Sequence, residues 1–327
     1  MLHLVNGGAT LKRLAPLALP GTLLVWNDIL VEGPVRPRGP GRAEWQERGA
    51  VLERRLGIPA AAYAEGMARC QAALEEAGPA GQLDEVVLWF EEDLFCQVHL
   101  AHLLDRLDPG LPTSLICPET PLGRRAPEDL AQLFRARAPV TPGRRALARE
   151  LVEAFARSDP SDLEALRSGP LNAWPRLQAG LTGHARRFPA LRDGLSLTER
   201  VALAALVEGP RPFGQAFARL AADPVAAALG YTDLQLRADL AELATGPAPL
   251  VQAADGQAAH EWGPHATGPV APAAPTLELT ALGREVVAGR QDRAHLVPLD
   301  RWLGGVHLSG PRPAWRWDDT RGEITPG

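Results

Sequence analysis

Lysine is almost absent from this sequence of 327 residues: Lys12 is the only one, and every other basic side chain is an arginine. Such a skew can reflect genomic base composition, so it predicts no arginine-specific ligand, although arginine suits carboxylates and phosphates better than lysine. Cysteine is also scarce. Cys70, Cys96 and Cys117 show neither CxxC spacing nor an even number. We therefore expect no disulfide framework and a reducing, cytoplasmic setting.

Long hydrophobic runs are missing as well. No apolar stretch approaches about 18 residues, the length that would suggest a membrane helix. A strand is predicted to begin within two residues of Met1, which leaves no room for the charged and apolar regions of a signal peptide. We expect neither secretion nor membrane insertion.

The composition is that of a globular protein, with 46% hydrophobic and 22% charged residues. The length predicts two domains. Charge is uneven: residues 119–193 carry 13 arginines and 9 acidic residues, a net charge of +4, although the whole chain carries −5. This basic middle segment could form a surface for an anionic partner, or simply a solvated helix face.

The stretch 86–104, VVLWFEEDLFCQVHLAHLL, predicts a buried strand that runs straight into a helix. Its first five residues are apolar, as in a parallel strand covered by helices on both faces. Glu91, Glu92 and Asp93 follow at the carboxyl end of the strand, where open α/β sheets place ligand crevices. If Asp93 begins the helix, Gln97 lies one turn on and shares its edge. The same acids could equally satisfy orphan helix amides without any ligand.

Polar residues follow two further predicted strands. Residues 2–5 lead into Asn6 and a glycine turn that lacks full GxGxxG spacing, and residues 23–26 lead into Asp28 and Glu32. Residues 114–117 supply a fourth strand. Strands that alternate with helices predict a Rossmann-like α/β domain over 1–140 with a mainly parallel sheet. We expect a helical insertion at about 40–78.

Three segments of this half, HLVNGG, VWNDILVEGPV and VVLWFEEDLFCQ, closely resemble the bacterial family known as domain of unknown function 1835, DUF1835. The C-terminal RWLGGVHL and WRWD resemble the region that usually accompanies it. The family has no established reaction, so the resemblance implies no catalytic residues. Its members usually read Asn-Gly-Asp in the first turn, where this chain has Gly8. A ligand contact made by that acid would be lost here or supplied from elsewhere.

The second half is predicted to be mostly helical. A helical connector spans 141–193, and a capping box of Ser196 and Glu199 opens a winged-helix-like domain over 194–290. Its wing would pair residues 250–251 with 277–279 around a mobile loop at about 254–275. In the tail, 291–327, two strands joined through residues 309–313 would form a tryptophan-rich hairpin.

Several candidate sites in this half are ordinary on inspection. The helix 232–244 would be the recognition helix, yet it carries Asp233, Asp239 and Glu242 against Arg237 alone. Duplex DNA is therefore an unlikely partner of this domain. His260 and His265 fit no metal-ligand spacing and are expected to be loop residues. In the first half, His99 and His102 are expected to form a solvent-facing stripe on the helix after Asp93.

We expect a cytoplasmic protein that binds a small polar or nucleotide-like ligand at the strand carboxyl ends. One alternative is an enzyme that handles phosphate through Mg²⁺ held by Glu91 and Asp93, with help from Asp28. It lacks an obvious nucleophile or base. The other is a nucleic-acid-binding regulator that uses the basic middle segment and the tail. The expected ligand-binding residues are Asn6, Asp28, Glu32, Glu91, Asp93 and Gln97, with Trp302 and Arg316 as a stacking platform in the tail.

Overall fold

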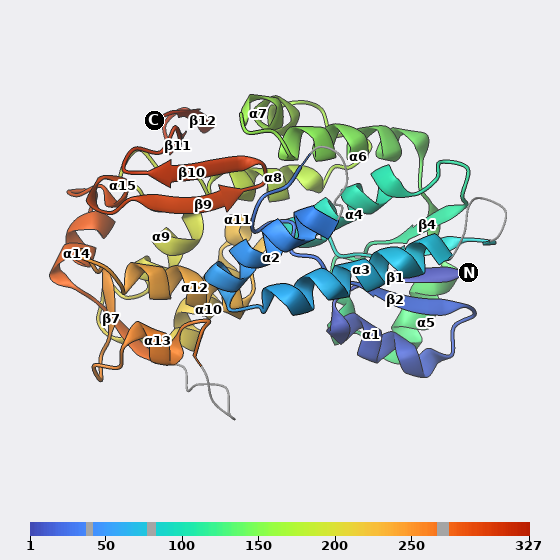
Figure 1. Ribbon diagram of the computed structural model, residues 1–327, viewed down its shortest axis with the longest axis horizontal. Helices are drawn as coiled ribbons and strands as arrows, with labels where there is room; N and C mark the ends of the chain where they lie inside the picture. The colour runs from blue at the N-terminus through green and yellow to red at the C-terminus, as the bar shows by residue number, and fades with distance from the viewer. Residues whose placement is uncertain (37–41, 77–82, 267–274) are drawn as a thin grey trace.

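A five-stranded sheet organises the first half of the computed structural model, which describes residues 1–36, 42–76, 83–266 and 275–327 (Figure 1). Its strand order is β2-β1-β3-β4-β5, with the first four parallel and β5 antiparallel to β4. The predicted α/β layer with a mainly parallel sheet is therefore confirmed. The strands are β1 (Leu2–Asn6), β2 (Thr22–Trp26), β3 (Val86–Trp89), β4 (Thr113–Ile116) and β5 (Ala138–Pro139).

The strand order creates a topological switch point between β1 and β3. The connection from β1 runs to β2 on one side, and the next connection crosses back over β1 to reach β3 on the other. In the register of the sheet, Leu4 lies opposite both Leu24 and Leu88. The carboxyl ends of β1 and β3 are consequently adjacent, which is where open α/β sheets bind their ligands.

Helices cover both faces of the sheet because alternate strand residues point to opposite sides. On one face, Val5 and Val87 belong to a hydrophobic cluster with Leu14 of α1 and Leu130 of α5. On the other, Leu4 and Leu88 belong to the main core with α3 and α4 (Figure 1). The helices and short 3-10 turns of this half are α1 (Gly8–Leu14), η1 (Ala15–Leu17), α2 (Arg42–Leu56), α3 (Ala60–Glu76), α4 (Leu94–Arg106), η2 (Leu122–Arg124) and α5 (Pro127–Arg135).

The predicted helical insertion consists of α2 and α3, which pack on each other. The connector contributes α6 (Pro142–Phe155), α7 (Ser161–Ser168) and α8 (Leu177–Ala185). Because α4 packs against α6 and α8 as well as the sheet, His99 and His102 are buried. The expectation that they face solvent was wrong. His99 Nε2 accepts a hydrogen bond from the Leu30 amide at 3.2 Å.

The second half combines helices with a three-stranded antiparallel sheet of order β6-β8-β7. The predicted capping box of Ser196 and Glu199 is confirmed at the start of α9. Trp262 is fully buried within the segment expected to be a mobile loop; residues 267–274 of that segment lie outside the described residues. The elements are α9 (Leu197–Ala204), β6 (Arg211–Pro212), α10 (Phe213–Ala222), α11 (Pro224–Ala227), α12 (Asp233–Leu243), β7 (Val251–Ala253), α13 (Ala259–Trp262), β8 (Thr276–Leu279), α14 (Ala281–Val287) and α15 (Arg293–Leu296).

The tail forms two hairpins, so the prediction of a single hairpin through residues 309–313 was wrong. One pairs β9 (Leu299–Leu303) with β10 (Val306–Gly310), and the other pairs β11 (Trp315–Asp318) with β12 (Glu323–Pro326). The first turns at Gly304 and Gly305. Gly304 has φ +64° and lies so close to the Phe155 carbonyl that a Cβ would overlap it. A two-residue glycine turn is the common way to close such a hairpin.

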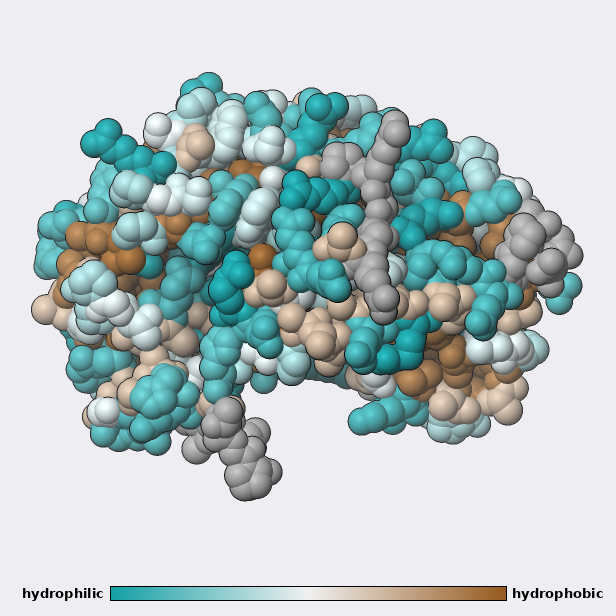
Figure 2. Space-filling view, in the orientation of Figure 1, coloured by the Kyte–Doolittle hydropathy of each residue, from teal (hydrophilic) through white to brown (hydrophobic). Residues whose placement is uncertain are grey.

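The two halves share one hydrophobic core. Its largest cluster of buried residues extends from Leu2 to Val286, across the connector. On the face shown in Figure 2, hydrophilic side chains dominate and hydrophobic ones lie between them. Among the helices that the structure describes, none is both long and apolar enough to cross a membrane.

Candidate functional site

The three consecutive acids after β3 point to two different places. Glu91 and Asp93 face a crevice at the switch point, whereas Glu92 faces the β4 side and pairs with Arg176 at 2.8 Å. The chain bends at Glu92 and Asp93 after β3 has ended, and the bend separates the two directions. One acidic cluster in the sequence thus becomes two separate environments in the fold.

The first environment, the switch-point crevice, has a volume of about 350 Å³. Three segments build it: the loop from β1 to α1, the loop from β3 to α4, and the stretch around η2 after β4, which supplies Pro121, Gly123 and Arg124. Gly230, between α11 and α12, covers it from the second half. Three of the predicted residues meet here, together with others that were not predicted. Its polar lining comprises Asn6, Thr10, Glu91, Asp93, Cys96 and Arg124.

Asp93 has a structural task in this crevice, because it is the N-cap of α4. Its Oδ1 accepts a hydrogen bond from the Cys96 amide at 2.9 Å. The preceding two amides of the helix, those of Leu94 and Phe95, donate to the carbonyls of Ala228 and Leu229 at 2.8 and 3.2 Å. The positive end of α4 is therefore satisfied by the chain itself, and Asp93 keeps only part of its carboxylate for a ligand.

The carboxylates of the crevice are poorly compensated. Burial raises the pKa of Glu91, although the Leu122 amide donates to its Oε1 at 2.7 Å. Burial also raises the pKa of Asp93. Within the described residues, no ion pair forms with either side chain. A ligand that offers hydrogen-bond donors or positive charge would offset the cost of their burial.

Cys96 brings a thiol beside the two carboxylates. Its Sγ accepts a hydrogen bond from Asn6 Nδ2 at 3.0 Å, and burial raises the pKa of the thiol well above its ordinary value. One donor atom each from Glu91, Asp93 and Cys96 lie within 4.8 Å of one another. The sequence analysis missed this residue, although its place one helical turn after Asp93 was a usable signal.

Asp28 lies away from the crevice, in a closed ion pair with the insertion. Arg48 Nη2 is 3.1 Å from its Oδ1, and the Tyr63 hydroxyl donates to the same oxygen at 2.7 Å. Burial alone would raise the pKa of Asp28, but the positive charge of Arg48 outweighs it, and the pKa falls to about 2. The carboxylate is thus committed to holding α2 and α3 onto the sheet.

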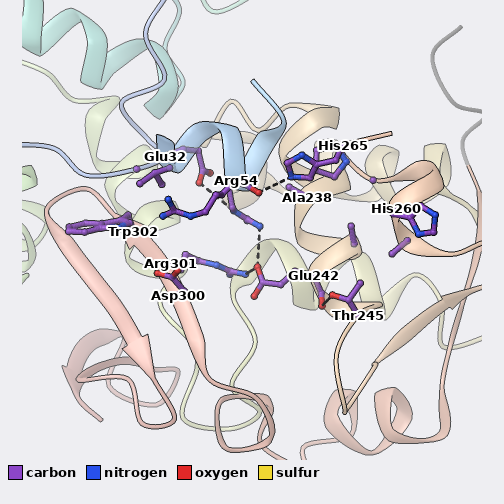
Figure 3. A pocket seen from close by; sticks show the side chains of 17 residues that line it. Glu32, Arg54, Ala238, Glu242, Thr245, His260, His265, Asp300, Arg301 and Trp302 are labelled. Atoms are coloured by element: carbon purple, nitrogen blue, oxygen red, sulfur yellow. Dashed lines mark hydrogen bonds and ion pairs between the residues drawn. The ribbon is translucent and has the colours of Figure 1, made fainter. Parts of the chain in front are cut away.

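Glu32 and Trp302 line a different space, a cavity of about 440 Å³ between α2, α12 and β9 (Figure 3). Glu32 is buried and bonded to Arg187 at 2.5 Å and to Gln235 at 2.9 Å. Trp302 stacks on the His307 ring, with 4.2 Å between ring centroids. Neither residue reaches the carboxyl ends of β1 and β3.

The floor of this cavity is a network of buried charges. Arg55 pairs with Asp239 and with Glu242, the latter at 3.1 Å. Arg301 pairs with Glu199 at 2.8 Å and with Glu242 at 3.1 Å. Because these acids and arginines compensate one another, the network needs no ligand to neutralise its charges. It joins the insertion to the second half and the tail.

The remaining two predicted residues lie elsewhere. Arg316 lies on β11 of the tail and is buried. It donates to the Ala190 carbonyl and pairs with Asp292 at 2.8 Å. It therefore contacts a different part of the molecule from Trp302. Gln97 faces the β4 side, where it donates to the Glu91 carbonyl and accepts from the Trp174 indole. There it lines a cavity of about 480 Å³, here called the β4-side cavity.

No protein-family model matches the sequence, and no curated protein matches it significantly.

Proposed function

We propose that this protein binds a small polar ligand rich in hydrogen-bond donors, such as a nucleoside, in the switch-point crevice. The observation that carries the proposal is the convergence of Asn6 and Thr10 with Glu91 and Asp93 at the switch point of the sheet. The free carboxylate oxygens would accept from ligand hydroxyl or amino groups. In dinucleotide-binding sheets too, an acidic residue accepts from a ribose hydroxyl, although it lies about 20 residues after the first turn and not after the third strand.

The charge of the crevice narrows the ligand class. Two half-buried carboxylates, Glu91 and Asp93, face one arginine, Arg124, so a phosphate group would meet net repulsion. The amides that could have bound a phosphate at the start of α4 already donate to Ala228 and Leu229. A nucleoside therefore fits better than a nucleotide, and the second half would cover the bound ligand through Gly230.

The test compares ribose, adenosine and AMP as additives in thermal unfolding. Ribose and adenosine should raise the melting temperature by mass action, and AMP should raise it less. Glu91→Gln should abolish the rise. Glu92→Gln is the matched control, because this neighbouring acid faces the β4 side and should leave the rise intact. A rise that survives Glu91→Gln, or a stronger response to AMP, would contradict the proposal.

A second candidate function is metal-dependent catalysis, favoured by the donor set of Glu91, Asp93 and Cys96 within 4.8 Å. The acidic sequence pattern alone suggests Mg²⁺, which prefers oxygen ligands throughout. A thiolate beside two carboxylates suits Zn²⁺ better. Three protein ligands would leave one position for water or substrate, as in catalytic zinc sites. The metal would supply Lewis acidity there, while Asn6 would orient Cys96 through its hydrogen bond to Sγ.

Cobalt provides a direct test of this candidate, because a Co²⁺–thiolate bond absorbs strongly in the near ultraviolet. We expect such a band with the wild type and its loss in Cys96→Ser. Cys70→Ser and Cys117→Ser are matched controls that should keep the band, since neither sulfur belongs to the donor set. A titration without the band, or a band lost in a control variant, would exclude Cys96 as a ligand.

We also propose that residues 194–290 form a winged-helix-like unit that makes protein contacts instead of entering a DNA groove. Support for the topology comes from the order α9, β6, α10, α12, β7, β8 and the sheet order β6-β8-β7. Support for the role comes from α12, which is covered by α2 and α13 and whose Asp239 and Glu242 pair with Arg55. A helix so enclosed cannot present its side chains to base edges.

Membership of the DUF1835 family and a cytoplasmic location both stay predictions. The three cysteines are free in the structure, in keeping with a reducing compartment.

A further inference from the structure

The β4-side cavity contains a cation, Arg144, with which no carboxylate of the described residues pairs. Arg144 is half-buried, its Nε donates to the Ala173 carbonyl at 3.3 Å, and its guanidinium lies 5.1 Å from the centre of the Trp174 ring. Among the described residues it forms no ion pair. Burial lowers the pKa of Arg144, because its charge is removed from water, and the nearby Cys117 thiol offsets only part of this effect. Arg55 and Arg301, by contrast, each pair with several acids.

The surroundings of Arg144 reinforce the positive potential. Thr141, which also lines the cavity, caps α6 by accepting from the Arg144 amide at 3.2 Å. The positive end of the helix dipole therefore lies at the cavity. At the rim, Arg176 pairs with Glu92 at 2.8 Å and also with the exposed Glu119, so the rim adds no positive charge. Among the described groups that line the cavity, Arg144 is thus the cation without a carboxylate partner.

The remaining walls are largely apolar. Leu115, Pro139, Val140 and Pro175 line the cavity, and the buried amide of Gln97 is already occupied by Glu91 and Trp174. With a volume of about 480 Å³, the cavity lies within the usual range for small-molecule sites. Its combination of one cationic group and apolar walls selects a ligand with one anionic group and an apolar body.

We propose that the β4-side cavity binds a small organic anion, whose carboxylate or phosphate group lies against Arg144 and whose apolar body lies against Leu115 and Val140. A guanidinium offers parallel N–H groups that match either anion in a bidentate arrangement. This site is separate from the switch-point crevice, because Glu91 and Asp93 line only the latter. The proposal does not rest on the proposed function.

The test measures the binding of phenyl phosphate, benzoate and inorganic phosphate by calorimetry, with ionic strength held constant by KCl. The wild type should bind phenyl phosphate and benzoate more tightly than inorganic phosphate, which lacks the apolar body. Arg144→Gln should weaken the binding of phenyl phosphate and of benzoate by about tenfold or more, as expected for loss of a charge-assisted contact. Arg149→Gln is the matched control: it lies on α6, is 67% exposed and pairs with Asp105 at 3.6 Å.

A second variant keeps the result interpretable if Arg144→Gln is poorly folded. Val140→Phe fills part of the cavity without changing its charge. It should weaken the binding of phenyl phosphate more than the binding of inorganic phosphate. Three outcomes would overturn the proposal: no binding by the wild type at millimolar concentration, equal weakening by Arg149→Gln, or equal affinity of Val140→Phe and the wild type for phenyl phosphate. The second would show a diffuse surface charge effect only.

Discussion

Gly230 of the second half lies directly against Asp93 of the first, so closely that a Cβ on Gly230 would overlap Oδ1 of Asp93. Gly230 also has φ +65°, a conformation that other residues rarely adopt. This contact places the segment between α11 and α12 over the N-cap of α4. The switch-point crevice is thus closed by residues more than a hundred positions away in the sequence.

Replacing Gly230 by alanine should destabilise the protein and disturb the crevice. Gly246→Ala is a matched control, because Gly246 has φ +82° and no atom within 4 Å of an added Cβ. The control should cost about 1 kcal/mol, the usual penalty of a left-handed alanine. Gly230→Ala should cost clearly more, measured by urea unfolding. If Gly230→Ala and Gly246→Ala lowered the free energy of unfolding equally, Asp93 would have moved to accommodate the added Cβ at no energetic cost.

Acid should destabilise the protein through its buried histidines. Burial lowers the pKa of His99 to about 4, and burial likewise lowers the pKa values of His102 and His184 to about 3. Below pH 6.5 the unfolded chain binds protons at these positions and the folded chain does not. The free energy of unfolding therefore decreases as the pH is lowered. At pH 5 each histidine should cost about 2 kcal/mol.

His184 offers the cleanest test of this effect, since neither ring nitrogen has a hydrogen-bond partner among the described residues. His184→Leu should reduce the loss of stability between pH 7 and pH 5, as measured by urea midpoints. The exposed His260→Leu serves as control and should leave the pH dependence unchanged. An identical pH dependence in all three proteins would rule out His184 as a source of acid sensitivity.

The ion pair of Asp28 and Arg48 should matter far more than a surface pair. Asp28→Asn leaves a buried guanidinium uncompensated and should cost about 3–5 kcal/mol of unfolding free energy. The pKa of Asp28 in the folded wild type is about 2. The stabilisation from its ionised carboxylate is therefore present above the ordinary pKa of aspartate and is lost as the pH falls toward 2. Glu47→Gln, in an exposed pair with Arg36, should cost less than about 1 kcal/mol.

Duplex DNA binding should be weak at physiological salt. Arg237 donates to the Trp262 carbonyl at 3.0 Å, and Arg145 donates to the Thr113 hydroxyl at 2.8 Å, so both guanidinium groups have partners within the chain. Fluorescence anisotropy of the wild type, Arg237→Ala and a triple Ala variant at 144, 145 and 149 tests this. Any binding should depend on the triple set. Tight binding lost only in Arg237→Ala would show that α12 enters a groove.

Local patterns predicted the sheet and part of the crevice. An apolar run followed by polar residues located the ends of β1 and β3, and adjacency in a parallel sheet then brought Asn6 to Glu91 and Asp93. The separation of Glu92 from its neighbours follows from a bend at Glu92 and Asp93, which the sequence pattern did not predict. The turn at Gly304 and Gly305 was predictable, because two glycines between apolar runs are a hairpin signal.

Asp28 and Glu32 were expected at the ligand site but lie elsewhere, because each pairs with residues that are distant in sequence. Asp28 follows its strand as expected, but Arg48 and Tyr63 come from the insertion and occupy its carboxylate. Glu32 is occupied by Arg187 and Gln235, about 155 and 203 positions away. A carboxylate at a strand end looks the same in sequence whether a ligand or a remote arginine will neutralise it.

The carbonyls of Ala228 and Leu229 that receive the amides of α4 have a consequence for how this protein could diversify. A recombinant gene that exchanged only codons 1–140 would carry over Asn6, Glu91 and Asp93, yet α4 would meet foreign acceptors at its first turn. The recombinant protein would therefore not acquire the ligand preference of the parent that supplied residues 1–140. Evolution, or a designer, would have to move both halves together to transplant the site.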